Sequence, residues 1–248
     1  MSFPSFISTP GQKILFWFII GAIGIYLLFR WLKKKTTEYY KQEYWENRYS
    51  WYTQEMDWYT GFSQINKDFL IEAILKEKYP HKNKCNILEL GCGNSSLSYG
   101  LYQIGYKQII SIDFSPTVIS QMKAKYGEST SISYLCVDFN RMDQFFDENQ
   151  FDVIIEKAGL DSIAVRNSPD VPKLLFNIYE KMHKVLKVNG IVLSISSKNP
   201  VFWKNSVLNK LVDNKMFEII QIKKTVFTNP KNPTLMNLYF YYLQKVEK

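Results

Sequence analysis

Short apolar runs alternate with helix-like segments along most of the chain. Runs rich in Ile, Leu and Val indicate strands, whereas apolar residues three or four positions apart indicate helices. The predicted strands cover 87–90, 109–113, 132–137, 151–156, 190–196, 217–222 and 235–243. The predicted helices cover 62–79, about 95–104, a segment that begins at 115–116, about 170–187 and about 203–212. This alternation predicts an α/β fold, with helices on both faces of a mostly parallel, seven-stranded sheet.

Two local signals refine this prediction. Ser115 followed by Pro116 is typical of a helix start, with the serine as the cap and the proline in the first turn. The last two predicted strands have no helix between them. We therefore expect them to pair antiparallel, as a terminal hairpin-like element of the sheet.

The N-terminal part of the chain has a different pattern. From Ile14 to Phe29 no residue is charged, and apolar side chains run all round the expected helix. Such a helix would be ~24 Å long, short of the ~30 Å hydrocarbon core of a bilayer. Because Lys13 and Arg30 can extend toward the headgroups, we predict one short transmembrane helix that precedes the sheet. A cleaved signal peptide and a helix buried in a soluble core are the alternatives.

The placement of charge divides the chain into three parts. The net charge is +8, and five of the 31 basic residues precede Glu38, the first acid. We predict a membrane anchor with a basic flank over 1–37, an aromatic-rich lead-in over 38–61 and a globular domain over 62–248. More bases follow the apolar run than precede it, which by the positive-inside rule places the domain in the mitochondrial matrix or the cytosol. The basic, aromatic and acid-free N-terminus favours the mitochondrial inner membrane over the cytosolic face of an endomembrane.

Composition excludes several functions. The globular part is nearly balanced in charge and lacks the clustered bases that nucleic-acid binding requires. Three cysteines without a C-x-x-C pair do not form a disulfide scaffold, and with only two histidines a zinc site of the usual kind is not expected. The expected partners are the membrane, through one helix, and a protein substrate or the other subunits of a membrane complex.

Glycines and acids gather where the predicted strands end. Gly91 and Gly93 lie where the first strand turns toward a helix, and glycines there let a ligand approach the backbone closely. Glu89, Asp113 and Asp138 lie at the ends of three consecutive strands, which meet at one edge of a parallel sheet. An acid such as Asp113 can bind both hydroxyls of a ribose, and Asp138 is placed to face an adenine amino group.

The nature of the ligand follows from two departures from the dinucleotide-binding pattern. Ser96 stands where that pattern has its third glycine, and Glu89 beside the turn would repel a pyrophosphate. A carboxylate there suits a ligand with a cation, such as an α-ammonium group or a sulfonium. An NAD-dependent reductase is therefore the weakest of the candidate functions.

The motifs resemble those of class I S-adenosylmethionine-dependent methyltransferases, and more narrowly the branch of elongation-factor lysine methyltransferases. The motifs are Y-W-E-N-R-Y at 44–49, D-W-Y at 57–59, L-E-L-G-C-G-N-S-S-L-S at 88–98, I-D-F-S at 112–115 and F-D-V-I-I-E-K-A-G-L-D-S at 151–162. The resemblance covers about 44–246. It departs at Ala158 and Gly159, on the acceptor side, where the branch has Gly-Thr.

The resemblance implies a Rossmann-like fold, S-adenosylmethionine as the cofactor and a set of cofactor-binding residues. It implies that Glu89 and the turn Gly91–Gly93 hold the methionine part, and that Arg48 and Trp58 close over the cofactor. The predicted cofactor-binding residues are Arg48, Trp58, Glu89, Gly91, Cys92, Gly93, Asn94, Asp113, Phe114, Asp138, Phe139 and Glu156. The alternatives are a surface ion pair of Arg48 with Glu43 or Glu46, and plain core packing for Trp58.

Two acids after the fourth strand are the candidate catalytic residues. An amine must lose a proton before it accepts a methyl group, and Glu156 or Asp161 could assist this step. The alternative for both is a structural role, such as a salt bridge to Lys157. Two functions follow: a membrane-anchored methyltransferase that acts on a lysine or N-terminal amine of a protein, or an inactive accessory subunit of a membrane complex such as a mitochondrial respiratory complex.

Overall fold

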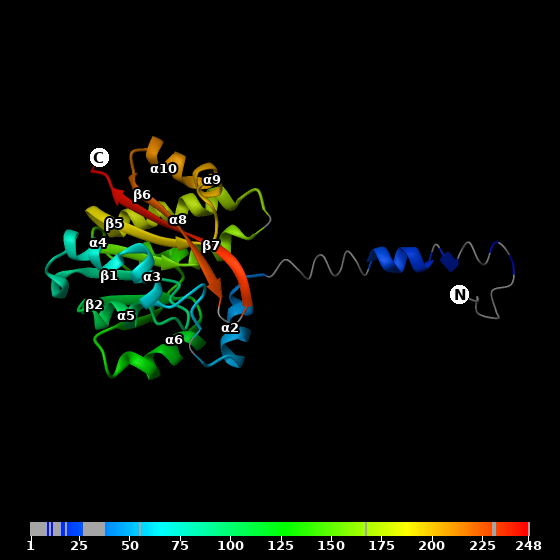
Figure 1. Cartoon of the computed structure of the whole chain (residues 1–248), viewed down its shortest axis with the longest axis horizontal. Helices are drawn as coiled ribbons and strands as arrows, with labels where there is room; N and C mark the ends of the chain where they lie inside the picture. The colour runs from blue at the N-terminus through cyan, green and yellow to red at the C-terminus, as the bar shows by residue number, and fades with distance from the viewer. Residues whose placement is uncertain are drawn as a thin grey trace. The chain divides into compact units, whose positions relative to one another are not determined.

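The structure is a computed structural model that describes residues 9, 11, 16–17, 19–26, 38–54, 56–166, 168–229 and 232–247. The chain forms two units, Met1–Glu38 and Tyr39–Lys248 (Figure 1). In the first unit, residues 16–17 and 19–26 are helical. The remaining residues of the predicted transmembrane helix over 14–29, and the basic flank over 30–35, lie outside the described residues.

The prediction of a transmembrane helix is wrong. None of the helices in the described part of the chain is both long enough and apolar enough to cross a bilayer. The physical reason lies in the length of the uncharged run, which at ~24 Å is shorter than the ~30 Å hydrocarbon core. The single-pass localisation in the mitochondrial inner membrane or in an endomembrane depended on this helix and is corrected with it.

The second unit is built on a seven-stranded sheet with the strand order β3-β2-β1-β4-β5-β7-β6. The strands are β1 Asn86–Leu90, β2 Gln108–Asp113, β3 Ser133–Cys136, β4 Phe151–Lys157, β5 Leu186–Ser196, β6 Phe217–Asn229 and β7 Asn232–Lys245. The strands β1 to β5 pair parallel, and β7 pairs antiparallel with both β5 and β6. The predicted mostly parallel sheet with an antiparallel terminal strand is confirmed.

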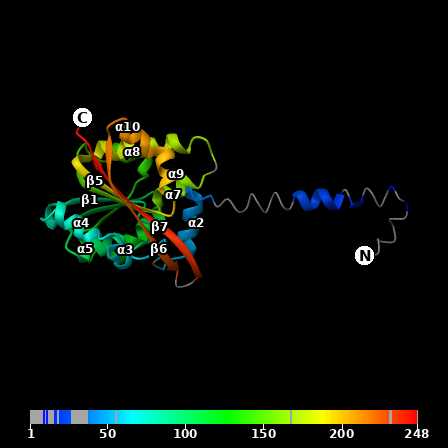
Figure 2. The ribbon, with the colours of Figure 1, turned by 45° about the horizontal axis from the view of Figure 1, so that its top comes forward.

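Helices cover both faces of the sheet (Figure 2). One apolar core takes buried side chains from the first five helices of the second unit, and the other core takes them from its remaining helices. The first group is α2 Gln42–Trp51, α3 Phe62–Phe69, α4 Ile71–Lys78, α5 Leu97–Gln103 and α6 Pro116–Met122. The second group is α7 Gly159–Ala164, α8 Val171–Val185, α9 Pro200–Trp203 and α10 Asn209–Asp213. Four further helical turns are η1 Lys82–Lys84, η2 Lys123–Gly127, η3 Phe139–Gln144 and η4 Lys204–Leu208.

The structure shows one helix boundary that the local sequence predicts and one that it does not. The Ser115 hydroxyl accepts the Val118 N–H at 3.2 Å and so caps α6, as expected. The predicted helix over 62–79 is two helices, because Leu70 takes a left-handed conformation with φ 59° between α3 and α4. The aromatic segment before them contains α2, which the sequence pattern did not predict.

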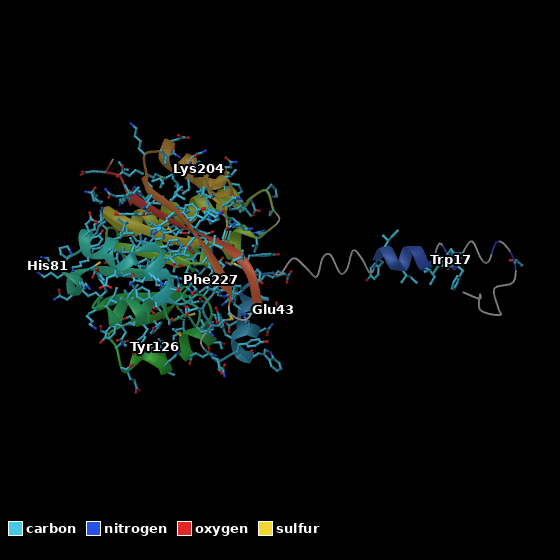
Figure 3. The ribbon with its side chains drawn as sticks, in the orientation of Figure 1. Trp17, Glu43, His81, Tyr126, Lys204 and Phe227 are labelled. Atoms are coloured by element: carbon cyan, nitrogen blue, oxygen red, sulfur yellow. The ribbon has the colours of Figure 1, made fainter. Side chains whose placement is uncertain are left out.

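The β6–β7 hairpin extends beyond the carboxyl edge of the sheet. β7 pairs with β5 as far as Tyr239, opposite Ser196, and then continues paired only with β6. Figure 3 shows Phe227 on this extension, and the nearby Met236 reaches the cavity described below. The tip of the hairpin thus lies at the edge where β1, β2 and β4 end, whereas β7 runs from there toward the opposite edge.

Candidate cofactor and acceptor site

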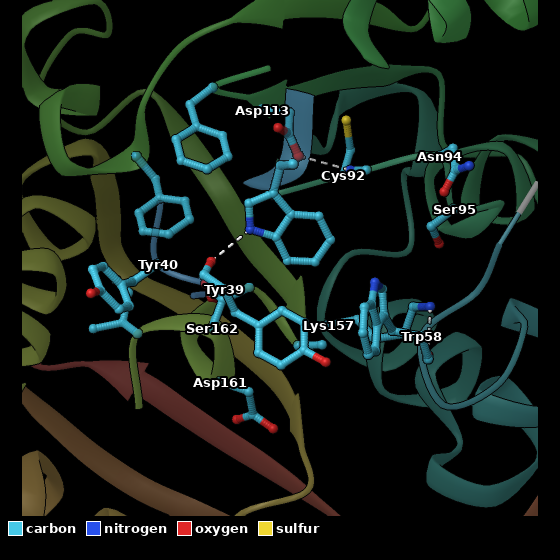
Figure 4. A pocket seen from close by; sticks show the side chains of 18 of the residues that line it. Tyr39, Tyr40, Trp58, Cys92, Asn94, Ser95, Asp113, Lys157, Asp161 and Ser162 are labelled. Carbon is cyan, nitrogen blue, oxygen red and sulfur yellow. Dashed lines mark hydrogen bonds between the residues drawn. The ribbon is translucent and has the colours of Figure 1, made fainter. Parts of the chain in front are cut away.

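A cavity of about 290 Å³ opens at the carboxyl ends of β1, β2 and β4. Its walls come from the turn after β1, the ends of β2 and β3, the β4–α7 turn and the aromatic segment before α3 (Figure 4). The predicted cofactor-binding residues that line it are Trp58, Gly91, Cys92, Gly93, Asn94, Asp113, Phe114, Asp138 and Phe139. Arg48, Glu89 and Glu156 are not among the described lining residues. The sheet edge therefore brings most of the predicted set together.

The glycine turn and Asp113 form one hydrogen-bonded unit. Gly91 and Gly93 have φ values of 62° and 50°, a region that favours glycine. The N–H of Gly93 donates to Asp113 Oδ2 at 3.0 Å, and the N–H of Ser115 donates to Oδ1 at 3.0 Å. A Cβ atom on Gly93 would lie 2.8 Å from the Tyr49 hydroxyl, so this position also has no room for a side chain. Burial raises the pKa of Asp113 to about 6, although these N–H donors oppose the shift.

Glu89 lies behind the turn rather than on the cavity surface. Its side chain is 2% exposed and accepts a hydrogen bond from the Ser111 hydroxyl at 2.8 Å. Burial raises the pKa of Glu89 to about 7, so near neutral pH this group exchanges between its charged and neutral forms. Its geometry points to support of the turn, since its hydroxyl partners are Ser111 on the neighbouring strand β2 and Ser98 in α5, the helix that follows the turn.

Arg48 and Trp58 leave two buried donors next to the cavity. The Arg48 guanidinium lies 5.3 Å from the centre of the Trp58 ring and donates to Met56 Sδ at 2.8 Å. Its described contacts are with Met56, with the Tyr44 hydroxyl and with the rings of Tyr52 and Trp58, rather than with Glu43 or Glu46. Arg48 Nε and Trp58 Nε1 are both buried without a hydrogen-bond partner. Buried N–H groups are seldom left unpaired, so these two fit a site for an anionic group such as a carboxylate.

Trp58 also packs within an aromatic cluster. Its ring centre lies 5.8 Å from that of Trp45 and 5.7 Å from that of Tyr39. The two roles considered for Trp58, a cavity wall and core packing, are therefore combined in one side chain. The Tyr39 carbonyl accepts the Trp45 Nε1–H at 2.6 Å, which ties the start of the domain to α2.

The far end of the cavity is polar. Asp161 accepts hydrogen bonds from the Tyr59 hydroxyl, from the Ser196 hydroxyl and, at 2.8 Å and 2.9 Å, from the N–H and hydroxyl of Ser197. Burial, reinforced by the Asp161 carboxylate, raises the pKa of the Tyr59 hydroxyl well above its ordinary value, so Tyr59 remains a donor. Figure 4 shows Asp161 on the opposite side of the cavity from Asp113.

Glu156 lies below the β4–α7 turn. It is buried, accepts the Leu160 N–H at 3.2 Å and also accepts a hydrogen bond from the Ser194 hydroxyl. Burial raises the pKa of Glu156 to about 8. Directly above it, Ala158 has a left-handed backbone with φ 66°, and a Cβ atom on Gly159 would lie 3.5 Å from Glu156 Oε2.

The salt bridge that Lys157 forms is not the one considered from the sequence. Lys157 Nζ lies 2.9 Å from Asp57 Oδ1, in a pair whose side chains are 3% and 14% exposed. The Asp57 carboxylate also accepts the hydroxyls of Ser95, at 2.5 Å, and Ser96, at 2.8 Å. The electrostatic influence of Lys157 and these hydrogen bonds lower the pKa of Asp57 despite an opposing effect of burial.

Several cavity residues were missed by sequence reasoning. They include Tyr39, Tyr40, Trp45, Tyr49, Tyr59 and Met236. The aromatic density of the lead-in and the D-W-Y motif were the available signals for the first five. Met236 gave none, because its position depends on the length of the β6–β7 hairpin.

The Asp138 carboxylate, which the sequence predicts to face the adenine, is hydrogen-bonded to a residue close to it in the chain. It accepts the backbone and side-chain N–H groups of Asn140, both at 2.8 Å. Together with Phe139 it forms the cavity wall that follows β3. The glycine turn, the carboxylate at the end of β2 and this wall define the protein as an α/β protein with a site for an adenosyl-type cofactor.

Comparisons with known proteins give the family. A family profile described as "Methyltransferase domain" matches residues 81–236. The protein therefore belongs to the methyltransferase domain family, and its cofactor is S-adenosylmethionine. The residues fit this cofactor, because Trp58, whose Nε1 is unpaired, lines the cavity beside Arg48, and the Asp113 carboxylate lines it at the end of β2.

Curated relatives place it near methyltransferases of elongation factor 1A. EEF1A lysine methyltransferase 4 of Mus musculus is 28% identical over 180 residues, which cover 69% of this chain and 66% of the relative. The eEF1A lysine and N-terminal methyltransferase of Mus musculus is 30% identical over 178 residues, or 71% of this chain and 24% of that protein. The matches thus span less than two thirds of either relative.

Solved structures share the fold. A SAM-dependent methyltransferase from Methanosarcina mazei has a TM-score of 0.53 at 16% identity, over 67% of this chain and 94% of that one. The cyclase SpnF has a TM-score of 0.53 at 15% identity, over 78% and 86%. Since a cyclase shares the architecture, the reaction has to be inferred from the site rather than from the fold.

Proposed function

We propose that the protein transfers the methyl group of S-adenosylmethionine to an amine of a protein substrate, either a lysine side chain or an N-terminus. The observation that supports this most directly is the carboxylate of Asp161 at the far end of the cofactor cavity. An amine arrives as a cation, and a carboxylate that accepts hydrogen bonds from Tyr59 and Ser197 attracts and orients it.

The cofactor half of the proposed site uses the glycine turn and the two unpaired donors. Arg48 and Trp58 bind the carboxylate of the methionine part through Nε and Nε1. Asp113 binds the ribose hydroxyls, while Asp138 and Phe139 form the wall against the adenine. The cofactor supplies an electrophilic methyl group on a sulfonium, and methyl transfer from it is a displacement in line with the leaving sulfur.

The acceptor half orients the amine and excludes water. In this proposal Asp161 accepts a hydrogen bond from the amine and takes up its proton, while the Tyr59 hydroxyl keeps the carboxylate in place. The role of Glu156 is to support the turn over 158–160 from below through the Leu160 N–H. Gly159, where the related branch has threonine, leaves more room on this side, since a Cβ would lie only 3.4 Å from the Leu90 carbonyl.

Elongation factor 1A is the first substrate to test, because it is named as the substrate of the relatives. The full chain is incubated with purified elongation factor 1A and S-adenosylmethionine carrying a labelled methyl group. Mass spectrometry then shows whether a lysine or the N-terminus is modified. If the chain binds the cofactor and methylates no amine of this or any other protein in a cell extract, the proposed function is overturned.

Variants separate the two halves. Asp161→Asn should lower kcat/KM for the acceptor by about 10- to 100-fold, the loss expected for a hydrogen bond to a charged group. Its affinity for S-adenosylhomocysteine, measured by calorimetry, should stay within about twofold of the wild type. Tyr40→Phe is the matched control, because Tyr40 also lines the cavity but has no contact with Asp161 among the described hydrogen bonds.

A further inference from the structure

A buried ammonium group holds the segment 57–61 in place. Lys157 Nζ donates to Asp57 Oδ1 at 2.9 Å, to the Trp58 carbonyl at 3.0 Å and to the Thr60 carbonyl at 3.3 Å. The Lys157 side chain is 3% exposed. A charge removed from water to this extent requires such partners, so the conformation of the segment and the position of the ammonium depend on each other.

The same segment contributes to both halves of the cavity. Trp58 lies beside Arg48 in the cofactor half, whereas the hydroxyl of Tyr59 reaches Asp161 in the acceptor half. Tyr59 has φ 69°, a conformation that a bulky residue adopts only where its surroundings impose it. Two consecutive side chains thus point to different ends of the site, and the Lys157 ammonium holds the backbone that carries them.

The network continues to the cofactor turn. Asp57 accepts the hydroxyls of Ser95 and Ser96, which directly follow the glycine turn after β1. The ion pair therefore joins the end of β4, the aromatic segment and the turn that approaches the cofactor. No other ion pair among those described in this chain lies at the cavity wall.

We propose that Lys157 and Asp57 are positioning residues that fix Trp58 and Tyr59 together, so that one buried ion pair assembles the cofactor half and the acceptor half. The acceptor part of this inference rests on the proposed function. The cofactor part rests only on the binding of S-adenosylmethionine. Loss of the ion pair should therefore weaken the binding of both the cofactor and the acceptor. A change confined to one half of the cavity should weaken the binding of only one of them.

The test is Lys157→Met in the full chain. Methionine has similar length and no charge, and Asp57 keeps its bonds to Ser95 and Ser96. We expect about tenfold weaker binding of S-adenosylhomocysteine by calorimetry, and faster hydrogen exchange of the amides of 57–61. The KM for the acceptor should rise as well. The control is Lys187→Met, which removes a 2.9 Å ion pair with Asp152 at the start of β4 and should change neither the affinity nor this exchange.

A second variant keeps the inference testable if Lys157→Met does not fold. Asp57→Asn alone leaves a buried ammonium without its carboxylate and should be the least stable variant, whereas Asp57→Asn combined with Lys157→Met removes both charges and should fold better. Either folded variant with wild-type affinity and wild-type exchange of 57–61 would overturn the inference. If affinity and exchange respond as expected but the wild type methylates no amine, the proposed function fails while the cofactor part of the inference stands.

Discussion

Ala158 has a backbone conformation that costs an L-amino acid free energy. Its φ of 66° and ψ of −5° lie in the left-handed region, where a Cβ atom crowds the backbone by roughly 1–2 kcal/mol. The conformation is imposed at the junction of β4 and α7, where the Ala158 N–H donates to the Ile195 carbonyl at 3.0 Å.

Ala158→Gly should therefore raise the free energy of unfolding by about 1 kcal/mol, part of the relief being offset by the greater chain entropy of glycine when unfolded. Denaturant unfolding of the two proteins measures the difference. Ala164→Gly, at the end of α7, is the control and should lower stability, since glycine is unfavourable in a helix. A destabilised Ala158→Gly variant would show that the alanine methyl group contributes packing that outweighs the strain.

Asp113 uses both of its oxygens, which makes it sensitive to amide replacement. Asn offers one acceptor where Asp offers two, so Asp113→Asn leaves either the Gly93 or the Ser115 N–H unpaired. We expect a loss of roughly 2–3 kcal/mol of binding free energy, or about 30- to 150-fold weaker binding of S-adenosylhomocysteine. Asp143→Asn, which weakens a partly buried pair with Lys181 away from the cavity, should bind normally. Equal affinities for the two variants would remove Asp113 from the cofactor site.

At the scale of elements, the strands could be predicted because their apolar runs are long and bounded by turn residues. The acids at the ends of β1, β2 and β3 followed from this, since parallel strands share one carboxyl edge. α2 could not be predicted in the same way. Its buried residues are Trp45 and Tyr49, four positions apart, and the rest of the helix is polar enough to hide the pattern. The break at Leu70 has no glycine or proline to mark it.

The β4–α7 turn adds a pH dependence to the stability of the fold. Burial raises the pKa of Glu156 in the folded protein to about 8, well above the ordinary value near 4.5. Between these two pKa values, the folded state thus holds a proton on Glu156 that the unfolded state has released. The stability that this proton confers is complete below the unfolded pKa and is lost as the pH rises toward 8.

We therefore expect the melting temperature of the free protein to fall between pH 6 and pH 9, and Glu156→Gln to reduce this fall. Calorimetric scans across this range measure it. Part of the dependence should persist in the variant, because burial also raises the pKa of Glu89. Glu148→Gln, an exposed acid near Lys184, serves as the control and should leave the slope unchanged. A wild-type melting temperature that rises over this range would contradict the assignment of Glu156 as a buried neutral carboxyl.

At the scale of the whole molecule, the features that the sequence could not predict depend on contacts between distant positions. The Asp57–Lys157 pair joins residues one hundred positions apart, and nothing local in either segment marks the other as its partner. The prediction of a transmembrane helix in the N-terminal unit was wrong for a different reason. Its uncharged run has the composition of a membrane helix but not the length, and composition alone does not make a segment span a bilayer.

The division of the chain after Glu38 leads to a final prediction about truncated forms. Residues 39–248 contain the whole sheet, both cores and every described residue of the cavity. This fragment should fold and bind S-adenosylhomocysteine within about twofold of the full chain, because none of the described site contacts is removed. Binding by calorimetry and melting by circular dichroism test both statements.

A fragment that begins at residue 42 is the informative comparison, because it lacks only three further residues. It loses Tyr39, whose carbonyl accepts the Trp45 indole N–H at 2.6 Å and whose ring packs on Trp58 at 5.7 Å between centres. It also loses Tyr40 from the cavity wall. Aromatic contacts of this kind contribute about 1 kcal/mol each, so the fragment should bind the product about tenfold more weakly while its sheet remains intact. Equal affinity for the two fragments would mean that the start of the domain takes no part in the site, and failure of 39–248 to fold would mean that residues before Tyr39 support the domain.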